Sequence, residues 1–263
     1  MPKAVPRCLT IAGSDSGGGA GIQADLKAFA AAGCFGTSVI VALTAQNTVG
    51  VSAVEEASPS FVEAQLDAVF SDIGVDAAKT GMLFSRAVVE TVAGYLARHP
   101  VPLVVDPVMV ASSGARLLRE DAVETLVARL FPLATVITPN LLEAEALAGG
   151  PAPRDELARR LHALGPGAVI VTGGHGEDAV DTLYDGQRLV HIAVPRHAVA
   201  ATHGAGCTHS ATLAAMLAHG FELEEAARRA ASAAAEAVRH GLDWIGAGEG
   251  PVDVLHLAGD EAG

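Results

Sequence analysis

The sequence predicts an α/β fold in which helices cover both faces of a mostly parallel β-sheet. Short and very apolar runs, such as 8–12 and 102–105, alternate with longer amphipathic or alanine-rich stretches along the chain. Nearly every apolar run ends in a glycine or a polar residue. Alternating strands and helices build parallel units, and ligands of such sheets bind at the carboxyl ends of the strands.

Turn and cap signals divide the chain into elements. Gly33 closes a helix that begins near Ile22, an apolar stripe marks 60–72 as an amphipathic helix, and Asp185-Gly186 is a hairpin signal. We predict strands at 8–12, 38–43, 51–56 (an edge strand), 77–83 (strand, then loop), 102–105, 135–138, 168–171, 181–184 and 188–194. We predict helices at 22–32, 60–72, 86–98, 121–130, 142–147, 154–164, from the 202–208 segment to 216, and at 224–240. The tail from Gly246 is expected to be loose apart from 252–257.

Composition limits the function classes. The 263 residues carry a formal net charge of −13, which argues against non-specific binding to nucleic acid or an anionic membrane. The three cysteines show no paired spacing, so a reduced cytoplasm is the expected setting. We find no signal peptide before Gly13 and no apolar run of transmembrane length. By length, the chain fits one large α/β domain or two small ones.

The segment 202–208 (THGAGCT) is the feature around which the chain is organised. Gly204 and Gly206 let the backbone approach a ligand, and the free N–H groups of the following helix form an anion site. Cys207 lies at that helix start, where the pKa of a thiol can be lowered. Taken alone, the segment is equally compatible with an ordinary loop and a cysteine that fills the core.

Polar residues follow several predicted strands. Asp25 lies in the first turns of a helix, Gln46 and Asn47 end a strand, and Asp106 and Glu143 follow two others. Amides suit a heteroaromatic ring that presents donors and acceptors, and paired carboxylates suit Mg²⁺. Helix capping is the alternative for each of them.

Other site types find little support. The pattern GAGIQA at 19–24 matches a dinucleotide fingerprint formally, but the next strand ends without an acid for a ribose. The P-loop pattern is absent from the sequence. His197, His203 and His209 lack metal-ligand spacing, and we expect most of the ten histidines to be solvated.

Together the motifs resemble the hydroxymethylpyrimidine/phosphomethylpyrimidine kinases of thiamine biosynthesis, within the ribokinase-like family. The resemblance extends from about Leu9 to Val252. The motifs that carry it are AGSDSGGGAGIQADLK (12–27), TAQNT (44–48), KTGML (79–83), DPVM (106–109), TPNLLEAEAL (138–147), TGGH (172–175) and THGAGCT (202–208).

The resemblance implies a single ribokinase-like kinase domain over 1–263 and a role for each matched position. The residues matched to the pyrimidine pocket are Gly13, Asp25, Gln46, Met82 and Val108. The residues matched to the anion hole are Gly204, Ala205, Gly206 and Cys207, with Cys207 at the position of the general base. A thiol there could alternatively only position the substrate.

The same resemblance implies ATP and Mg²⁺ as cofactors. Asp106 and Glu143 match positions around the metal ion. Asn140, Glu143, Thr172 and Gly174 match positions around the nucleotide. The resemblance further implies a pyrimidine as the small-molecule substrate, a cytoplasmic homodimer, and no nucleic acid or membrane partner.

Three departures bear on phosphate binding. The family often has lysine where this chain has Ser112, Thr172 and Ala200. The second phosphorylation, of the pyrimidine monophosphate, is therefore left open. Two alternative functions also stay open: a pyridoxal or pyridoxine kinase, because the substrates are similar in size, and a non-catalytic pyrimidine-binding homologue. Loops at 112–116 and 198–203 are candidates for closure over the substrate.

Overall fold

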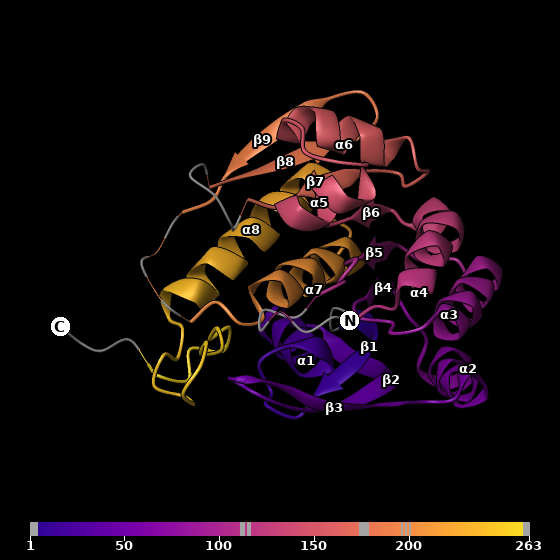
Figure 1. Cartoon of the computed structure of the whole chain (residues 1–263), viewed down its shortest axis with the longest axis horizontal. Coiled ribbons are helices and arrows are strands. Elements are labelled where there is room, and N and C mark those ends of the chain that lie inside the picture. The colour runs from indigo at the N-terminus through magenta and orange to yellow at the C-terminus, as the bar shows by residue number, and fades with distance from the viewer. Residues whose placement is uncertain are drawn as a thin grey trace.

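One β-sheet runs through the molecule and orders its strands β3-β2-β1-β4-β5-β6-β7-β8-β9 (Figure 1). The computed structural model describes residues 5–110, 114, 117–173, 179–195, 197, 199 and 201–259. Within them the strands are β1 (Arg7–Asp15), β2 (Phe35–Asn47), β3 (Gly50–Glu56), β4 (Ala77–Thr80), β5 (Leu103–Val105), β6 (Val136–Ile137), β7 (Val169–Val171), β8 (Val180–Tyr184) and β9 (Leu189–Ala193).

The middle of the sheet is parallel, as the sequence predicts. β1 pairs in parallel with β2 and β4, and the parallel pairing continues from β4 to β7. β3 and the β8–β9 hairpin are antiparallel additions at the two edges. The carboxyl ends of the central strands therefore lie along one edge of the molecule, where the polar residues are expected to gather.

Helices cover both faces of the sheet. They are α1 (Gly21–Ala31), α2 (Pro59–Ala68), α3 (Arg86–Arg98), α4 (Glu120–Thr125), α5 (Leu141–Leu147), α6 (Arg154–His162), α7 (Ala205–Ala218) and α8 (Leu223–Arg239). Single π-helical turns extend α2 (Val69–Ile73) and α4 (Leu126–Leu130), and a 3₁₀ turn (Phe131–Leu133) follows the second of them. None of the described helices is long and apolar enough to cross a membrane.

The sheet separates two apolar cores. Helices α2 to α6 pack on one face around residues such as Leu66, Val92 and Leu161. Helices α1, α7 and α8 pack on the other, mostly through alanines, with Phe29 as the large side chain. The small side chains of α7 let it pack closely against the sheet and against its neighbours α1 and α8, and every residue from 208 to 215 is buried.

Most element predictions are confirmed, with two differences. β1 and β2 are longer than predicted, because both continue past a shift in register into the glycine-rich and TAQNT segments. Residues 252–257 form turns and no strand or helix, and Pro251 instead makes a single bridge to His203. The prediction that β3 is an edge strand is confirmed.

Candidate active site

Two glycine-rich segments meet at the carboxyl edge of the sheet. Gly204 has a left-handed backbone (φ +88°), and a Cβ on it would lie 1.9 Å from the carbonyl oxygen of Gly19. A Cβ on Gly21, also left-handed, would lie 2.3 Å from the carbonyl oxygen of Gly13. The loop after β1 and the start of α7 are thus in backbone contact, which side chains at these positions would prevent.

Cys207 sits where these segments meet, in the first turn of α7. It is half-buried, and the N–H of Gly21 donates a hydrogen bond to its sulfur. Burial raises the pKa of Cys207 to about 12, the Asp25 and Asp106 carboxylates add to the rise, and Lys79 and Gly21 oppose it. Although a helix start can lower the pKa of a thiol, desolvation and two nearby negative charges raise it at this position.

A fully buried ion pair lies beneath Cys207. The Lys79 ammonium, at the end of β4, donates to both oxygens of Asp25 at 2.9 and 3.0 Å, and the Thr10 hydroxyl donates to Asp25 at 2.5 Å. Burial alone would lower the pKa of Lys79, but the acidic groups around it raise the pKa above its usual value. Burial raises the pKa of Asp25 and Asp106 adds to the rise, whereas Lys79 and the Thr10 hydroxyl oppose it, so the pairing offsets part of the cost of burying these charges.

Lys79 is a residue whose importance the sequence reading missed. Its side chain is completely buried and also lies 3.9 Å from Asp106, whose second partner is the Ser210 hydroxyl of α7 at 2.8 Å. The available signal was a lysine inside the apolar run of β4, since a fully buried lysine requires a paired charge. Through its contacts with Asp25 and Asp106, Lys79 connects β1, β4, the end of β5 and α7 in one network of hydrogen bonds and ion pairs.

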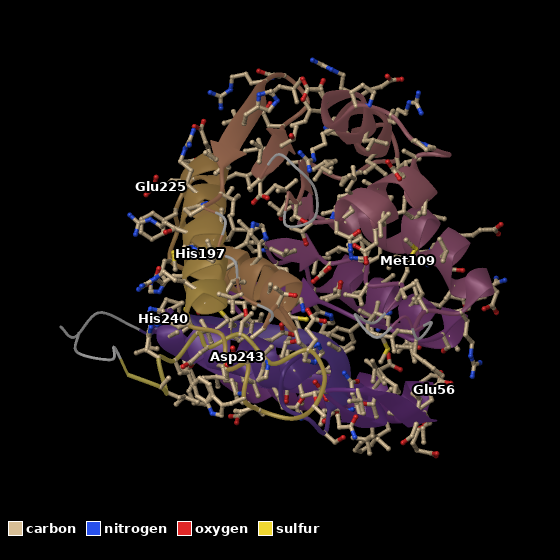
Figure 2. All side chains as sticks on the ribbon, turned by 60° about the vertical axis from the view of Figure 1, so that its left-hand side comes forward. Glu56, Met109, His197, Glu225, His240 and Asp243 are labelled. Atoms are coloured by element: carbon tan, nitrogen blue, oxygen red, sulfur yellow. The ribbon has the colours of Figure 1, made fainter. Side chains whose placement is uncertain are left out.

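Besides the Lys79–Asp25 ion pair, the site contains a pair of acidic residues, Glu143 and Asp106. Asn140 caps α5 and exchanges hydrogen bonds with Glu143 in a capping box, with Asn140 Oδ1 accepting at 2.9 Å and Glu143 Oε2 at 3.0 Å. The Met109 N–H donates to the other Glu143 oxygen at 3.4 Å; Figure 2 marks Met109. Burial first, and then the charge of Asp106, raise the pKa of Glu143 to about 8. Glu143 is thus both part of the cap of α5 and a buried acid beside Asp106.

The donor set of this acidic pair fits a hard divalent cation. Asp106 and Glu143 are both buried carboxylates, and their mutual repulsion is what a cation with oxygen ligands would relieve. Lys79, at 3.9 Å from Asp106, compensates only part of this charge because it is already bonded to Asp25. The residues present therefore fit Mg²⁺.

The five positions matched to a pyrimidine pocket are only partly brought together. Gly13 and Met82 are in contact: the Gly13 N–H donates to the Met82 carbonyl at 3.2 Å, and a Cβ on Gly13 would lie 2.5 Å from Met82 Cε. Val108 is half-buried in the turn after β5. The Asp25 side chain lies behind them with both oxygens already engaged.

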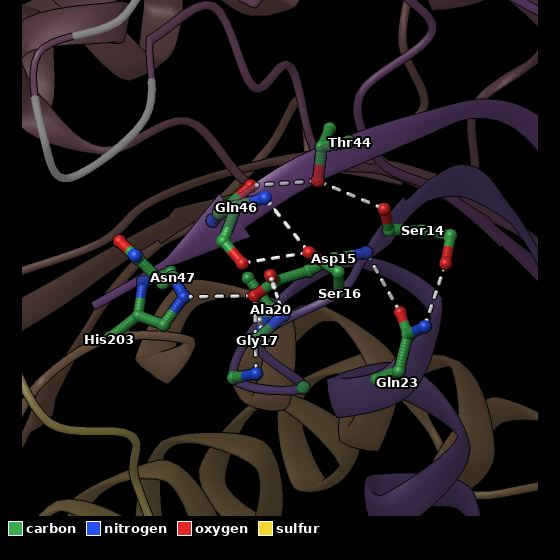
Figure 3. Close-up of polar contacts among 12 residues, drawn as sticks. Ser14, Asp15, Ser16, Gly17, Ala20, Gln23, Thr44, Gln46, Asn47 and His203 are labelled. Carbon is green, nitrogen blue, oxygen red and sulfur yellow. Dashed lines mark hydrogen bonds and ion pairs between the residues drawn. The ribbon is translucent and has the colours of Figure 1, made fainter. Parts of the chain in front are cut away.

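Gln46 lies farther out, on the β2–β3 hairpin. Its backbone exchanges hydrogen bonds with the Ser16 hydroxyl, and its side-chain oxygen accepts from Thr44 at 3.1 Å (Figure 3). It lines an open hollow of about 430 Å³ with Ser16, Ala45 and Asn47, and with residues 49–52. Gly13, Asp25, Met82 and Val108 do not line this hollow.

The positions matched to the nucleotide lie on neighbouring strands. Thr172, after β7, is bridged to Asn140, and its N–H donates to the Pro139 carbonyl at 2.9 Å. The N–H of Gly173 donates to Asp181 at 2.7 Å. Gly174, Ser112 and Ala200, and the loops that contain them, lie outside the described residues wholly or in part.

The histidines differ in how far they are exposed to solvent. Among those that the structure describes, only His99, His191 and His256 are exposed. His209 is buried with a ring nitrogen 3.2 Å from Asp181, without the alignment of a hydrogen bond. His203 is paired with Asp15. Of the nine histidines that the structure describes, His209 alone is buried and five are half-buried, so the prediction that most histidines are solvated holds fully for three of them and in part for five.

The assembled edge can hold an anion and a divalent cation next to a thiol. The first-turn N–H groups of α7, at Gly206 and Cys207, suit an oxyanion, and Asp106 and Glu143 suit the cation. Phosphoryl transfer needs this combination of aligned reactants and neutralised charge.

Comparison with known proteins identifies relatives along almost the whole chain. Residues 15–253 match the family described as phosphomethylpyrimidine kinase. A hydroxymethylpyrimidine/phosphomethylpyrimidine kinase of Rhizobium meliloti is 51% identical over 257 residues, covering 94% of this chain and 96% of the relative. The bifunctional thiamine biosynthesis protein ThiED of Geobacter sulfurreducens is 49% identical over 96% of this chain and 53% of its own length. An ADP complex of Bacillus subtilis pyridoxal kinase superposes with a TM-score of 0.86 at 37% identity, covering 97% of this chain and all of that one.

Proposed function

The chain belongs to the phosphomethylpyrimidine kinase family, and from this we propose that it transfers a phosphoryl group from ATP to 4-amino-5-hydroxymethyl-2-methylpyrimidine in thiamine biosynthesis. We include the second transfer, to the pyrimidine monophosphate, in the proposal. The observation that carries it is the convergence of the start of α7, Cys207 and the Asp106–Glu143 pair at one edge of the sheet.

The start of α7 would stabilise the transferring group. Gly204 begins the helix with a left-handed backbone, so the N–H groups of Gly206 and Cys207 follow in the first turn, whereas the Ala205 N–H already donates to the Thr202 carbonyl at 3.1 Å. Backbone donors that are fixed before the reaction contribute most where water is excluded. Gly204 is therefore needed for its conformation, and Gly206 and Cys207 for their backbone N–H groups.

Cys207 would position the attacking hydroxyl as a thiol. Its pKa of about 12 leaves little thiolate at neutral pH. Because phosphoryl transfer passes through a loose transition state, the hydroxyl proton needs to leave only late, and a strong base is not required at the start. This favours the positioning role for Cys207 over the role of a preformed base.

Asp106 and Glu143 would hold Mg²⁺, and Asn140, Thr172 and Gly174 would lie along the nucleotide. When bound, the metal ion supplies charge neutralisation for the phosphates. Asn140 already fixes the Glu143 carboxylate through the capping box, so the ligand is oriented before a metal binds. Gly13, Asp25, Gln46, Met82 and Val108 would surround the pyrimidine.

We further propose a cytoplasmic homodimer. The antiparallel strand β3 is an unpaired edge of the sheet in the described chain, next to the exposed side chains of Val49 and Leu43. A strand edge of this kind can pair with another chain or must be covered.

A single assay separates the candidate functions. ATP consumption is measured with the hydroxymethylpyrimidine, its monophosphate and pyridoxal in parallel. We expect turnover with both pyrimidines and little with pyridoxal. Pyridoxal is included because the chain superposes on a pyridoxal kinase. Turnover with pyridoxal alone would replace the proposal, and no turnover with any substrate would refute both kinase functions.

The role of Cys207 has its own test. Cys207→Ala should fold normally, because the side chain is small and half-buried, and should lower kcat about 10²-fold or more. Cys207→Ser keeps a hydroxyl that can donate and accept, and should retain more activity than Cys207→Ala. An unchanged kcat in Cys207→Ala would remove the residue from the mechanism.

A further inference from the structure

Asp15, at the end of β1, organises the glycine-rich loop that follows it. One carboxylate oxygen accepts the N–H of Gly17 at 2.7 Å, and the other accepts those of Gly19 at 3.1 Å and Ala20 at 2.9 Å. Burial would raise the pKa of Asp15, but the hydrogen bonds from His203 and from these N–H groups hold it below its usual value. The carboxylate is almost completely buried and therefore fixes the shape of the loop.

The same carboxylate reaches across to the other glycine segment. His203 Nε2 lies 3.1 Å from Asp15 Oδ2, the oxygen that also holds Gly19 and Ala20 (Figure 3). This contact joins residues that are 188 positions apart in the chain. His203 directly precedes Gly204, so its side chain leaves the backbone at the start of the proposed anion hole.

The backbone of His203 is itself fixed. Its N–H donates to Gly250 at 3.2 Å and its carbonyl accepts from Val252 at 3.0 Å. The neighbouring Thr202 hydroxyl donates to Glu249. His203 thus bridges the C-terminal segment and the end of β1, and α7 begins in between.

The packing at this bridge leaves no room for additional side-chain atoms. A Cβ on Gly19 would lie 2.3 Å from His203 Cδ2, and a Cβ on Gly204 would lie 1.9 Å from the Gly19 carbonyl oxygen. Side chain and backbone therefore hold the two segments together at adjacent points. Cys207 receives the Gly21 N–H across the same junction.

We propose that Asp15 and His203 are positioning residues for phosphoryl transfer: their contact holds the loop after β1 against the start of α7 and thereby sets the place of the Cys207 thiol. The inference rests on the proposed function. It gives a positioning role to Asp15 and His203, which are not among the nucleotide or pyrimidine positions named above. If the contact is lost, the two segments can separate, and a displacement of about 1 Å at a reacting group costs on the order of 10²-fold in rate.

The test compares His203→Leu with His203→Gln. Leucine cannot donate to Asp15, whereas the glutamine amide can. We expect His203→Leu to lower kcat for the hydroxymethylpyrimidine at least about 10-fold, with the KM for ATP changed less than about 2-fold because the nucleotide positions lie on other strands. His203→Gln should recover most of the kcat. The matched control is His191→Leu, which breaks an exposed histidine–aspartate contact of 2.8 Å with Asp155. It should behave as the wild type.

A second measurement does not depend on catalysis. The alkylation rate of Cys207 by iodoacetamide is followed by peptide mass spectrometry without substrates. We expect His203→Leu to react several-fold faster than the wild type, and His203→Gln and His191→Leu to react at the wild-type rate. Asp15→Asn, which keeps the shape of the side chain, serves if His203→Leu does not fold, and should also react faster.

The outcomes separate this inference from the proposed function. A wild-type enzyme that shows no kinase activity refutes the function, and the alkylation rates still test the junction. An active wild type together with a normal kcat and a normal alkylation rate in His203→Leu refutes the inference. Equal losses of kcat in His203→Leu and His203→Gln also refute it, because the hydrogen bond would then not matter.

Discussion

At the scale of single residues, the site depends on charges that are buried but paired. Asp25, Lys79 and Asp106 share one network, and Glu143 faces Asp106 from α5. Glycine spacing predicts that the loops can approach each other, and a lysine inside the apolar run of β4 is a signal for burial, but no local pattern identifies Asp25 and Asp106 as its partners. Partners that come from strands distant in the chain decide the ionisation of each group.

Removing one partner of the Lys79–Asp25 pair should lower the free energy of unfolding more than replacing both partners. Lys79→Met leaves a buried carboxylate without its cation and should lower the free energy of unfolding by about 3–5 kcal/mol. The double variant Lys79→Met/Asp25→Asn should recover part of that loss. Urea unfolding of the two single variants and the double variant measures the coupling.

An exposed ion pair serves as the control for this comparison of single and double variants. Arg98 and Glu63 lie 3.1 Å apart, and both side chains are largely exposed to solvent. Arg98→Met should cost less than about 1 kcal/mol. A loss of similar size in Lys79→Met would contradict the burial-based argument.

Glu143 should make stability depend on pH. Its folded-state pKa of about 8 lies above the model-peptide value, so its favourable contribution is complete below pH ~4.5 and is lost as the pH rises through about 8. Glu143→Gln cannot ionise. Relative to the wild type, the free energy of unfolding of the variant should rise by on the order of 4 kcal/mol between pH 5 and pH 9.

Thermal unfolding with a chelator present, at a series of pH values, measures this difference. The capping-box change in Glu143→Gln shifts its stability by a similar amount at every pH and therefore does not alter the slope. Parallel stability curves for the two proteins would contradict the raised pKa of Glu143.

At the scale of elements, α7 connects stability and function. Its buried, alanine-rich body packs against α1 and α8, and its first turn carries the proposed anion hole. The sequence predicts the helix and its glycine start, because both are local signals. It does not predict that Gly204 touches Gly19, since that contact is made only when the ends of β1 and α7 are brought together.

The two ends of α7 offer a matched pair of substitutions. Gly204 and Gly220 are both left-handed, with φ of +88° and +82°. An added Cβ meets the Gly19 carbonyl oxygen at Gly204 but open space at Gly220. Gly220→Ala should cost about 1–2 kcal/mol, for the backbone conformation alone, and leave kcat unchanged.

Gly204→Ala should cost more than this and should lower kcat more than about 10-fold. Chemical unfolding and steady-state kinetics on both variants provide the comparison. Equal kinetic effects at the two positions would show that the backbone contact of Gly204 with Gly19 is not important for the site.

At the scale of the whole molecule, the sheet separates two apolar cores that differ in how they relate to the site. Helices α2 to α6 complete a core on one face of the sheet, whereas α1, α7 and α8 form a core on the other face, and α7 begins at the site (Figure 1). Damage to the first core away from α5, which carries Glu143, should therefore affect stability alone.

Leu161→Ala and Leu213→Ala test this division. Both leucines are fully buried, Leu161 in the core of α2 to α6 and Leu213 on α7. Each substitution should lower the free energy of unfolding by about 2–5 kcal/mol. Only Leu213→Ala should also lower kcat, because relaxation around its cavity moves α7. A fall in kcat for Leu161→Ala, measured well below its Tm, would contradict the division.

The sequence by itself determines the fold class, nearly all the elements and the identity of the motifs. These follow from apolar periodicity and from glycine and cap signals, which act over a few residues. Even the capping box of Asn140 and Glu143 is a local pattern. The candidate site residues stay a prediction from the sequence, and the structure adds where each one lies.

Only the tertiary structure decides the electrostatics and the junction of the site. Burial and two carboxylates from distant parts of the chain raise the pKa of Cys207, whereas its position at a helix start suggests a lowered pKa. The tertiary structure also shows that Lys79 is the buried cation beneath the thiol and that His203 reaches Asp15. Each of these contacts joins segments that the chain itself keeps far apart, so no local pattern could predict it.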